Sequence, residues 1–215
     1  MKTKKSAMEK KEKETQLLIA VTELFMKYGI KSLTMDDISS HLGISKKTLY
    51  QYVSDKNDLV KKSIELAVNE DQCLLNDIAT NEENAIDEVL AINKRISQKL
   101  QSVQPAVMYD LQKHYPEAWK IMENHKQCFI YDMIINNINT GIEQGMYREN
   151  VNTEIVASVY VNMINKIFDF EMFPSHKFNF STLHKEIARY HIRGIASEKG
   201  LKFLVKRFKD NNHDF

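Results

Sequence analysis

Apolar residues recur along most of this chain at intervals of three and four, which is typical of helices that bury one face. The first such segment runs from Glu14 to Tyr28, and Gly29 follows where a helix of this kind would end. The pattern returns in six later segments: 81–100, 106–115, 117–145, 152–173, 180–195 and 197–208. With 6 glycines and 3 prolines in 215 residues, few residues are available for the turns between strands. The pattern predicts an all-α fold.

Residues 34–55 divide into shorter helical pieces with clear boundary signals. Thr34 precedes a first turn with two aspartates, and Ser45 precedes a second helix, so both stand at N-cap positions. Gly43 lies between these helices, where the chain needs a residue that tolerates positive φ. A helix-turn-helix also needs a small residue at the helix contact, here Ser39, and apolar residues at fixed offsets. Those offsets are all filled, by Ile38, Leu42, Ile44, Leu49 and Tyr52.

The second helix of this motif is crowded with hydrogen-bond donors. In a helix-turn-helix it lies in the major groove, with its N-terminal residues against base edges. Lysine ammonium groups and hydroxyls bind phosphates, whereas Gln51 and Thr48 can both donate to and accept from base edges. The alternative is that these residues only solvate the outer face of a small domain. Tyr50 and Tyr52 are poor choices for such a face, which favours DNA binding.

The charge distribution agrees with a DNA-binding N-terminal region. The formal net charge is +1, but residues 1–62 carry 13 lysines against 8 acids, and the remainder carries 17 basic against 21 acidic residues. A basic region on an acidic body indicates that one end meets a polyanion. A solvated lysine-rich tail is the alternative, and composition alone does not separate the two.

The stretch "AVTELFMKYGIKSLTMDDISSHLGISKKTLYQYVSDKNDLV" resembles the N-terminal DNA-binding domain of the TetR family of transcriptional regulators. The resemblance is close over residues 14 to about 60 and covers the rest only in outline. It implies a flexible basic arm (1–13), a three-helix DNA-binding domain (14–60) and a larger helical effector-binding and dimerisation domain (61–215). It also implies DNA contacts from Thr34, Ser45, Lys46, Thr48, Tyr50, Gln51, Tyr52 and Lys56. Lys47 replaces a residue that is often small in the family, which adds an expected phosphate contact.

The resemblance implies a homodimer formed by the last two long helices, roughly 153–173 and 181–195. A two-fold dimer places the recognition helices about 34–36 Å apart, on successive major grooves of an inverted repeat. The expected interface residues are Val156, Val159, Tyr160, Met163, Ile167, Leu183, Ile187 and Tyr190. Burial of the same residues in the chain's own core is the alternative.

The family usually binds a small-molecule effector inside the C-terminal body. Aromatic and methionine side chains with a few polar groups are typical of such sites. The pocket candidates are Tyr109, Trp119, Met122, His125, Phe129, Asp132 and Phe168. An ordinary hydrophobic core would show the same pattern, and nothing in the sequence indicates the chemistry of the effector.

Other functional classes find little support in the sequence. The seven histidines form no zinc-protease pair, there is no glycine-rich phosphate loop or nucleophile elbow, and no cofactor or metal is expected. A signal peptide and a membrane span are not expected either. Cys73 and Cys128 lie far apart and are expected as buried small apolar residues in a reducing, cytoplasmic setting.

These features together predict a non-enzymatic, sequence-specific DNA-binding regulator. The favoured form is a homodimeric repressor that leaves an inverted-repeat operator when an unknown small-molecule effector binds. The alternative is a DNA-tethered dimeric interaction module that responds to a protein partner.

Overall fold

The computed structural model describes residues 2–211, with side chains described for residues 8–208. Met1 and residues 212–215, the outer ends of the predicted arm and C-terminal domain, lie outside the described residues. Within that range every element of regular secondary structure is a helix. One isolated antiparallel bridge joins Tyr147 and Ala196. The prediction of an all-α fold is confirmed. No helix in the described range is long and apolar enough to cross a membrane.

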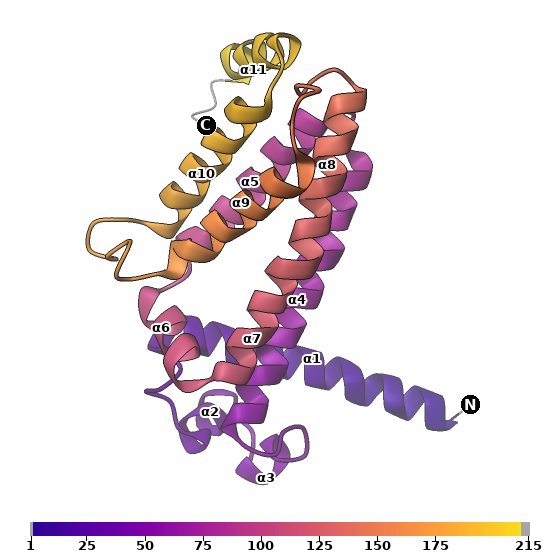
Figure 1. Ribbon diagram of the computed structural model, residues 1–215. Coiled ribbons are helices and arrows are strands. Elements are labelled where there is room, and N and C mark those ends of the chain that lie inside the picture. The colour runs from indigo at the N-terminus through magenta and orange to yellow at the C-terminus, as the bar shows by residue number, and fades with distance from the viewer. Residues whose placement is uncertain (1, 212–215) are drawn as a thin grey trace. The chain divides into compact units, whose positions relative to one another are not determined.

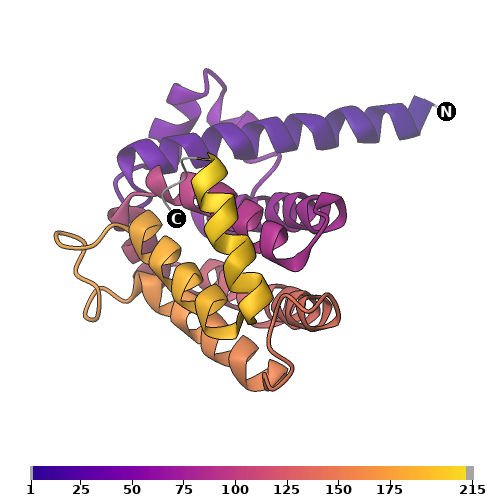
Figure 2. The same ribbon diagram turned by 90° about the horizontal axis from the view of Figure 1, so that it is seen from above.

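The helices follow one another in the order shown in Figure 1, and Figure 2 shows the same ribbon from above. Their bounds are α1 (Lys2–Tyr28), α2 (Met35–His41), α3 (Lys46–Leu49), α4 (Lys56–Asn81), α5 (Ala85–Gln101), α6 (Pro105–His114), α7 (Pro116–His125), the π-helical turn η1 (Lys126–Ile130), α8 (Tyr131–Glu143), α9 (Thr153–Asn165), the 3₁₀ turn η2 (Lys166–Phe168), α10 (Phe180–Ile195) and α11 (Glu198–Asn211).

The chain forms two compact units that are not continuous in sequence. The first contains Met1–Asp71 and Val103–Met122, and the second contains Gln72–Ser102 and Glu123–Phe215. Helix α4 therefore begins in the first unit and ends in the second.

Helix α1 is longer than the apolar pattern predicts. It begins at Lys2, so residues 2–13, expected as a flexible arm, are helical in the structure. Lysine and glutamate are good helix formers, and the sequence places Glu9 four residues before Lys13. The segment is polar on all sides, so hydrophobic periodicity does not predict a helix there.

The core of the first unit lies beneath the helix-turn-helix. Val21, Ile38, Leu49 and Leu59, from α1 to α4, are completely buried. Lys62 of α4 donates from Nζ to Glu14 Oε1 of α1 at 2.9 Å and to the carbonyl of Tyr52. One side chain thus ties together α1, α4 and the end of the helix-turn-helix.

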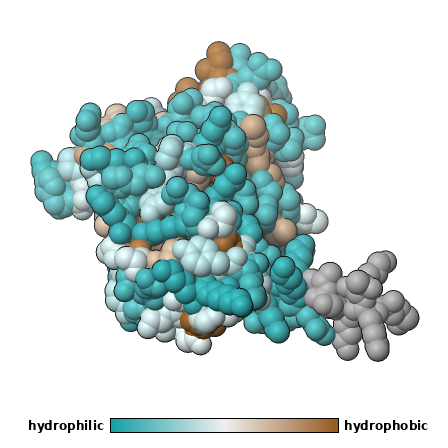
Figure 3. All heavy atoms as spheres, turned by 90° about the horizontal axis from the view of Figure 1, so that it is seen from below, coloured by the Kyte–Doolittle hydropathy of each residue, from teal (hydrophilic) through white to brown (hydrophobic). Residues whose placement is uncertain are grey.

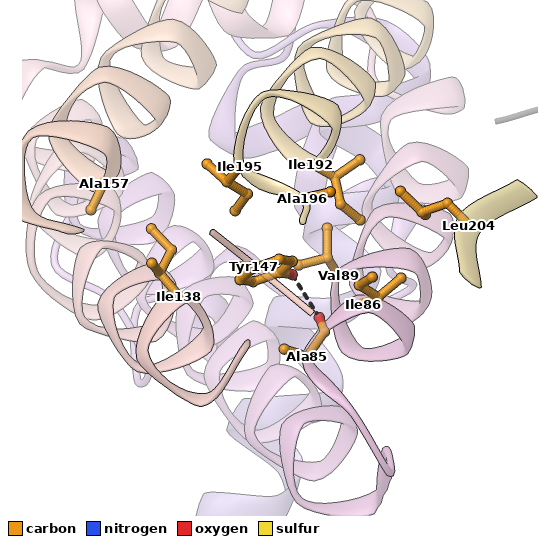
Figure 4. Packing of buried hydrophobic residues seen from close by; sticks show 10 residues of the cluster. All are labelled: Ala85, Ile86, Val89, Ile138, Tyr147, Ala157, Ile192, Ile195, Ala196 and Leu204. Atoms are coloured by element: carbon orange, nitrogen blue, oxygen red, sulfur yellow. Dashed lines mark hydrogen bonds between the residues drawn. The ribbon is translucent and has the colours of Figure 1, made fainter. Parts of the chain in front are cut away.

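The core of the second unit is built around Tyr147 (Figure 4). This side chain is 1% exposed, and its hydroxyl donates to Ala85 O at 3.1 Å and lies 3.0 Å from Asn137 Oδ1. Gly141 of α8 makes room for the ring, because an added Cβ would lie 2.1 Å from Tyr147 Cδ2. Apolar residues surround the ring: Ala85, Ile86, Val89, Ile138, Ala157, Ile192, Ile195, Ala196 and Leu204.

A buried polar layer lies between α5 and α10. Asn93 and Ser97 of α5 hydrogen-bond to each other, and His184 Nδ1 lies 3.2 Å from Asn93 Oδ1. His191, two turns further along α10, contacts Tyr160 of α9 with the rings tilted by 40° and their centroids 4.3 Å apart. Burial lowers the pKa of both histidines to about 4, so both are neutral near pH 7.

Helix α9 ends earlier than expected. The apolar pattern predicts one helix over 152–173, but α9 stops at Asn165 and η2 at Phe168. Asp169 follows, and its Oδ1 accepts the backbone N–H groups of Glu171 and Met172. This side chain competes with the helical ladder and turns the chain away, which apolar periodicity does not reveal.

Candidate DNA-binding surface

The turn between α2 and α3 has the geometry that the motif requires. Gly43 has φ +65°, and its N–H donates to Ser40 O at 3.1 Å. The next N–H, of Ile44, returns to Ser39 O at 3.1 Å, while Ser39 itself is buried at the helix contact. The left-handed glycine lets the chain reverse within three residues and start α3 directly. The sequence-based assignment of this turn is confirmed by its geometry.

Two hydroxyl side chains fix the starts of these helices. Thr34 Oγ1 accepts the N–H of Asp37 at 3.1 Å, while Asp37 Oδ2 accepts the N–H of Thr34 at 2.8 Å. Thr34 Oγ1 also donates to Asp37 Oδ2 at 2.6 Å, and the side-chain and backbone hydrogen bonds that this carboxylate accepts from Thr34 lower the pKa of Asp37. Ser45 Oγ accepts the N–H of Thr48 at 3.0 Å. The sequence predicts both caps, and both hydroxyl residues remain exposed.

The outer side of α3 is polar and its inner side is apolar. Leu49 is completely buried and Val53 nearly so, whereas Lys46, Lys47 and Gln51 are exposed. Tyr50 is also exposed, and Thr48 and Tyr52 are half-buried. Figure 3 views the molecule from the end where Figure 1 shows α2 and α3, and this face is mostly hydrophilic. The exposed ones among the predicted contact residues thus lie on and just after a very short helix, which is held in place by its buried Leu49.

Lys46 has a partner within the motif. Its Nζ lies 2.9 Å from Asp36 Oδ1 of α2, with both side chains well exposed, and this hydrogen bond raises the pKa of Lys46. Such exposed ion pairs contribute little to stability and are screened by salt. A competing phosphate can therefore displace Asp36 at small cost.

Lys56, unlike the other lysines among the predicted DNA contacts, is half-buried and donates to backbone carbonyls of the protein. Its Nζ donates to the carbonyl of Leu33 and, at 3.5 Å, to Lys31 O, and burial lowers its pKa. Asp110 of α6 accepts the N–H of Lys31 at 2.8 Å. Lys56 and Asp110 together clamp the loop before α2. No motif in the sequence signals this clamp, because its residues are separated by 25 and 79 positions.

Comparison with known proteins places this geometry in a family. Residues 17–62 match the model described as bacterial regulatory proteins, tetR family. Over 186 residues the chain is 26% identical to YvaF of Bacillus subtilis (strain 168), an uncharacterized HTH-type transcriptional regulator, covering 85% of this chain and 95% of that protein. Over residues 17–62 the chain is therefore similar to TetR-family regulators.

Two solved structures of transcriptional regulators match most of the chain. A transcriptional regulator from Cytophaga hutchinsonii superposes with a TM-score of 0.68 at 20% identity, over 85% of this chain and 97% of that one. A putative transcriptional regulator from Saccharomonospora viridis, solved in complex with choline, gives 0.65 at 14% identity over 87% and 100%. At these identities the likeness shows the fold alone. The match to the tetR-family model covers the helix-turn-helix, an element that binds DNA in other proteins.

The predicted effector residues divide between the two units. Tyr109, Trp119 and Met122 belong to the first unit, and the other four to the second. Asp132 is exposed, and Phe168 is buried edge-on against Phe180, with centroids 4.9 Å apart. The remaining two form a contact of their own.

His125 and Phe129 stack with ring centroids 5.2 Å apart, and His125 Nδ1 lies 3.3 Å from Gln72 Nε2. His125 directly precedes the π-helical turn η1 and Phe129 lies within it, and such irregularities are frequent at functional sites in other proteins. The assignment of all seven residues to an effector pocket stays a prediction.

A hollow of about 710 Å³ opens beside α9 in the second unit. Its lining includes none of the seven effector candidates. It is formed by Tyr131, Glu154, Ile155, Ser158, Val159, Asn162, Met163, Lys166, Met172, Phe173 and Ile187. Three of these, Val159, Met163 and Ile187, are among the residues expected at the dimer interface. Ile155 and Met172 are not, although Ile155 lies four residues before Val159 on the same helical face.

The predicted dimer residues differ in exposure. Val159 and Tyr190 are exposed, and Val156, Met163 and Leu183 are half-buried. Tyr160, Ile167 and Ile187 are buried within the second unit, so they act mainly as core beneath the exposed face. Assignment of these residues to a subunit interface stays a prediction.

Both cysteines are exposed, which corrects the expectation that they are buried. Cys73 lies two residues before Leu75, which is 1% exposed. Two residues correspond to about 200° around a helix, so Cys73 points away from the buried side. Among the described residues, no group of three or more histidine, cysteine or acidic side chains could hold a metal ion.

Proposed function

We propose that this protein is a homodimeric repressor that binds an inverted-repeat operator and is released by an effector. The observation that carries the DNA-binding half is the exposed polar side of α3, held on buried Leu49 behind a left-handed Gly43 turn. A reading element needs both properties, a rigid position and side chains free to meet base edges.

In this proposal the contact residues divide by chemistry. Lys46 and Lys47 bind backbone phosphates, which supplies affinity that depends on salt. Gln51 and Thr48 face base edges and supply sequence preference. Tyr50 and Tyr52 contact the sugar-phosphate backbone, Thr34 and Ser45 offer cap hydroxyls to it, and Lys56 flanks the site.

The exposed apolar residues of the second unit support a homodimer. Large exposed apolar patches mark interaction sites, and α9 carries Ile155 and Val159 on its outer side. A dimer explains how a four-residue helix such as α3 achieves specificity, because two copies read two half-sites.

Control by a small molecule is supported more weakly. The S. viridis structure contains choline, which shows that a protein of the same fold holds a small ligand. Regulation by a protein partner is the second candidate. Thermal shift against a broad panel of metabolites separates the two, since a ligand at 100 times its Kd adds roughly 2.7 kcal/mol of stability.

Selection of bound sequences from a random DNA pool tests the proposed function. The expected result is an enriched inverted repeat whose half-sites are centred about 10–10.5 base pairs, or a multiple, apart. Enrichment of a single half-site contradicts the dimer, and absence of any enrichment in dilute buffer contradicts sequence-specific binding.

A further inference from the structure

Asp36, in the first turn of α2, pairs with Lys46, the first residue of α3. Its Oδ1 lies 2.9 Å and its Oδ2 3.0 Å from Nζ of Lys46, so both carboxylate oxygens face the ammonium. The two residues are 10 positions apart and belong to the two helices of the motif, which pack together in Figure 1. Their side chains are 70% and 49% exposed, so a phosphate in solvent can reach the same ammonium.

The second acid of this turn, Asp37, has a different task. Its Oδ2 accepts hydrogen bonds from the N–H of Thr34 at 2.8 Å and from the Thr34 hydroxyl at 2.6 Å, which closes the capping box of α2. Removal of Asp37 would therefore loosen the start of the helix. Asp36 takes no part in this capping box. Its charge can be removed without removing a cap.

We propose that Asp36 competes with DNA phosphate for Lys46 and thereby lowers the affinity of each recognition helix for DNA. In the free protein the ammonium is held by the carboxylate, and on DNA it moves to a phosphate. The new ion pair forms at the expense of the old one, so its net gain is small. The carboxylate is then left beside the DNA backbone, and like charges in proximity oppose binding. This inference rests on the proposed function and adds to it a residue that weakens binding.

The penalty counts twice in the proposed homodimer. Each recognition helix carries its own Asp36, so a factor of about three on one copy becomes about ten on an operator with two half-sites. A copy that holds one half-site weakly depends on the second copy for occupancy. Asp36 thus makes binding depend more strongly on the complete inverted repeat. Because phosphates are the same in every sequence, the penalty applies to operator and random DNA alike.

Neutralisation of Asp36 tests the competition directly. Asp36→Asn keeps the size of the side chain and removes its charge. The Kd is measured by fluorescence anisotropy for the selected operator and for a random duplex, over a range of salt. We expect the variant to bind both about tenfold more tightly. The slope of log K against log salt should become steeper, because one negative charge per copy has left the surface that meets DNA.

A double-mutant cycle separates competition from a general charge effect. Lys46→Ala is made in the original protein and in the Asp36→Asn variant. If Asp36 competes for the ammonium, Lys46→Ala weakens binding more in the Asp36→Asn background, because there the lost phosphate contact is no longer offset by the pair with Asp36. We expect this difference to be about tenfold for the dimer. The other charged groups of α2 and α3, Asp37, His41 and Lys47, are present in every variant, so their contributions cancel.

Glu117→Gln is the matched control. Glu117 Oε2 lies 3.5 Å from Lys61 Nζ, and this exposed pair joins α4 to α7 in the same unit without a residue of the helix-turn-helix. The control therefore removes one negative charge and releases one lysine, as Asp36→Asn does, but away from the motif. Its Kd should stay within about twofold of the original. Circular dichroism and thermal unfolding verify that all variants are folded.

The failures of this inference and of the proposed function are distinguishable. If Asp36→Asn binds no more tightly than the original protein, or Lys46→Ala has the same effect in both backgrounds, Asp36 is no competitor while DNA binding stands. Tighter binding at particular base pairs only would assign Asp36 to a base edge and also overturn the inference. If the original protein and every variant ignore all duplexes in dilute buffer, the proposed function fails and this inference fails with it.

Discussion

In the first unit, the helix-turn-helix is shaped by hydrogen bonds between residues close in sequence, whereas the core of the second unit depends on residues far apart. Thr34 with Asp37 and Ser45 with Thr48 are each three positions apart. Tyr147 instead reaches Ala85, 62 positions away. The helix-turn-helix is therefore specified by short motifs, and the core of the second unit by packing complementarity that no short motif encodes.

This difference predicts where substitutions act. Changes on the exposed side of α3 should alter DNA binding with little effect on folding. Changes at the buried contacts of the second unit should alter folding first.

Acid should lower the free energy of unfolding of the second unit through its two buried histidines. His184 and His191 have pKa values near 4 in the folded chain and about 6.5 when unfolded, so the unfolded state binds more protons between these values. The stability that the two neutral histidines contribute is then complete above pH 6.5 and falls as pH drops towards 4. Between pH 7 and pH 5 we expect a loss of roughly 2 kcal/mol for each histidine.

Urea unfolding of His184→Gln and His191→Gln at both pH values measures this effect. Each variant should lose about 2 kcal/mol less than the original protein on acidification. His176→Gln, at an exposed histidine, is the control. A variant with the same pH dependence as the original would show that the replaced histidine is not buried in neutral form.

A methyl group at Gly141 should destabilise the second unit, because the added Cβ would lie 2.1 Å from the Tyr147 ring. Overpacking of this kind costs about 1–3 kcal/mol, and more where the neighbour cannot move. Gly194→Ala on α10 is the matched control, since its Cβ would meet nothing within 4 Å. Alanine is the better helix former, so this control should be neutral or up to about 1 kcal/mol more stable. Equal effects of the two substitutions on urea unfolding would contradict the packing around Tyr147.

Gln51→Ala should change base preference without changing stability. Removal of a good bidentate hydrogen bond to a base costs about 1–3 kcal/mol at the base pair concerned. Gel-shift titration against single-base variants of the selected operator locates the affected position. A uniform weakening across all of them would assign Gln51 to the backbone instead.

Lys46→Ala should have the smallest effect, weakening binding to all sequences alike. The slope of log K against log salt should fall by about one for each phosphate that no longer has a lysine partner. Lys202→Ala on α11 controls for the removal of one positive charge. Binding that stays unchanged over a range of salt would remove Lys46 from the interface.

The same comparison explains how much could be predicted from sequence. Caps, the Gly43 turn and the inward offsets are local signals, so the starts of α2 and α3 can be placed to within a residue or two. The exposure of Ile155 and Val159 could not be assigned in advance, because periodicity finds an apolar face without saying what covers it. The motif assigns Lys56 to DNA from its position alone, but its hydrogen bond to Leu33 O depends on a loop 23 positions away.

The loop at residues 29–33 is hydrogen-bonded to two helices. The Lys56 ammonium at the start of α4 donates to two of its carbonyls, and the Asp110 carboxylate of α6 accepts one of its N–H groups. Because both contacts lie on the segment that leads into α2, we expect a shift of α4 or α6 to move the start of α2 together with this segment. These hydrogen bonds couple the loop to both helices. Asp110→Ala, which changes neither the core nor α3, would weaken this coupling.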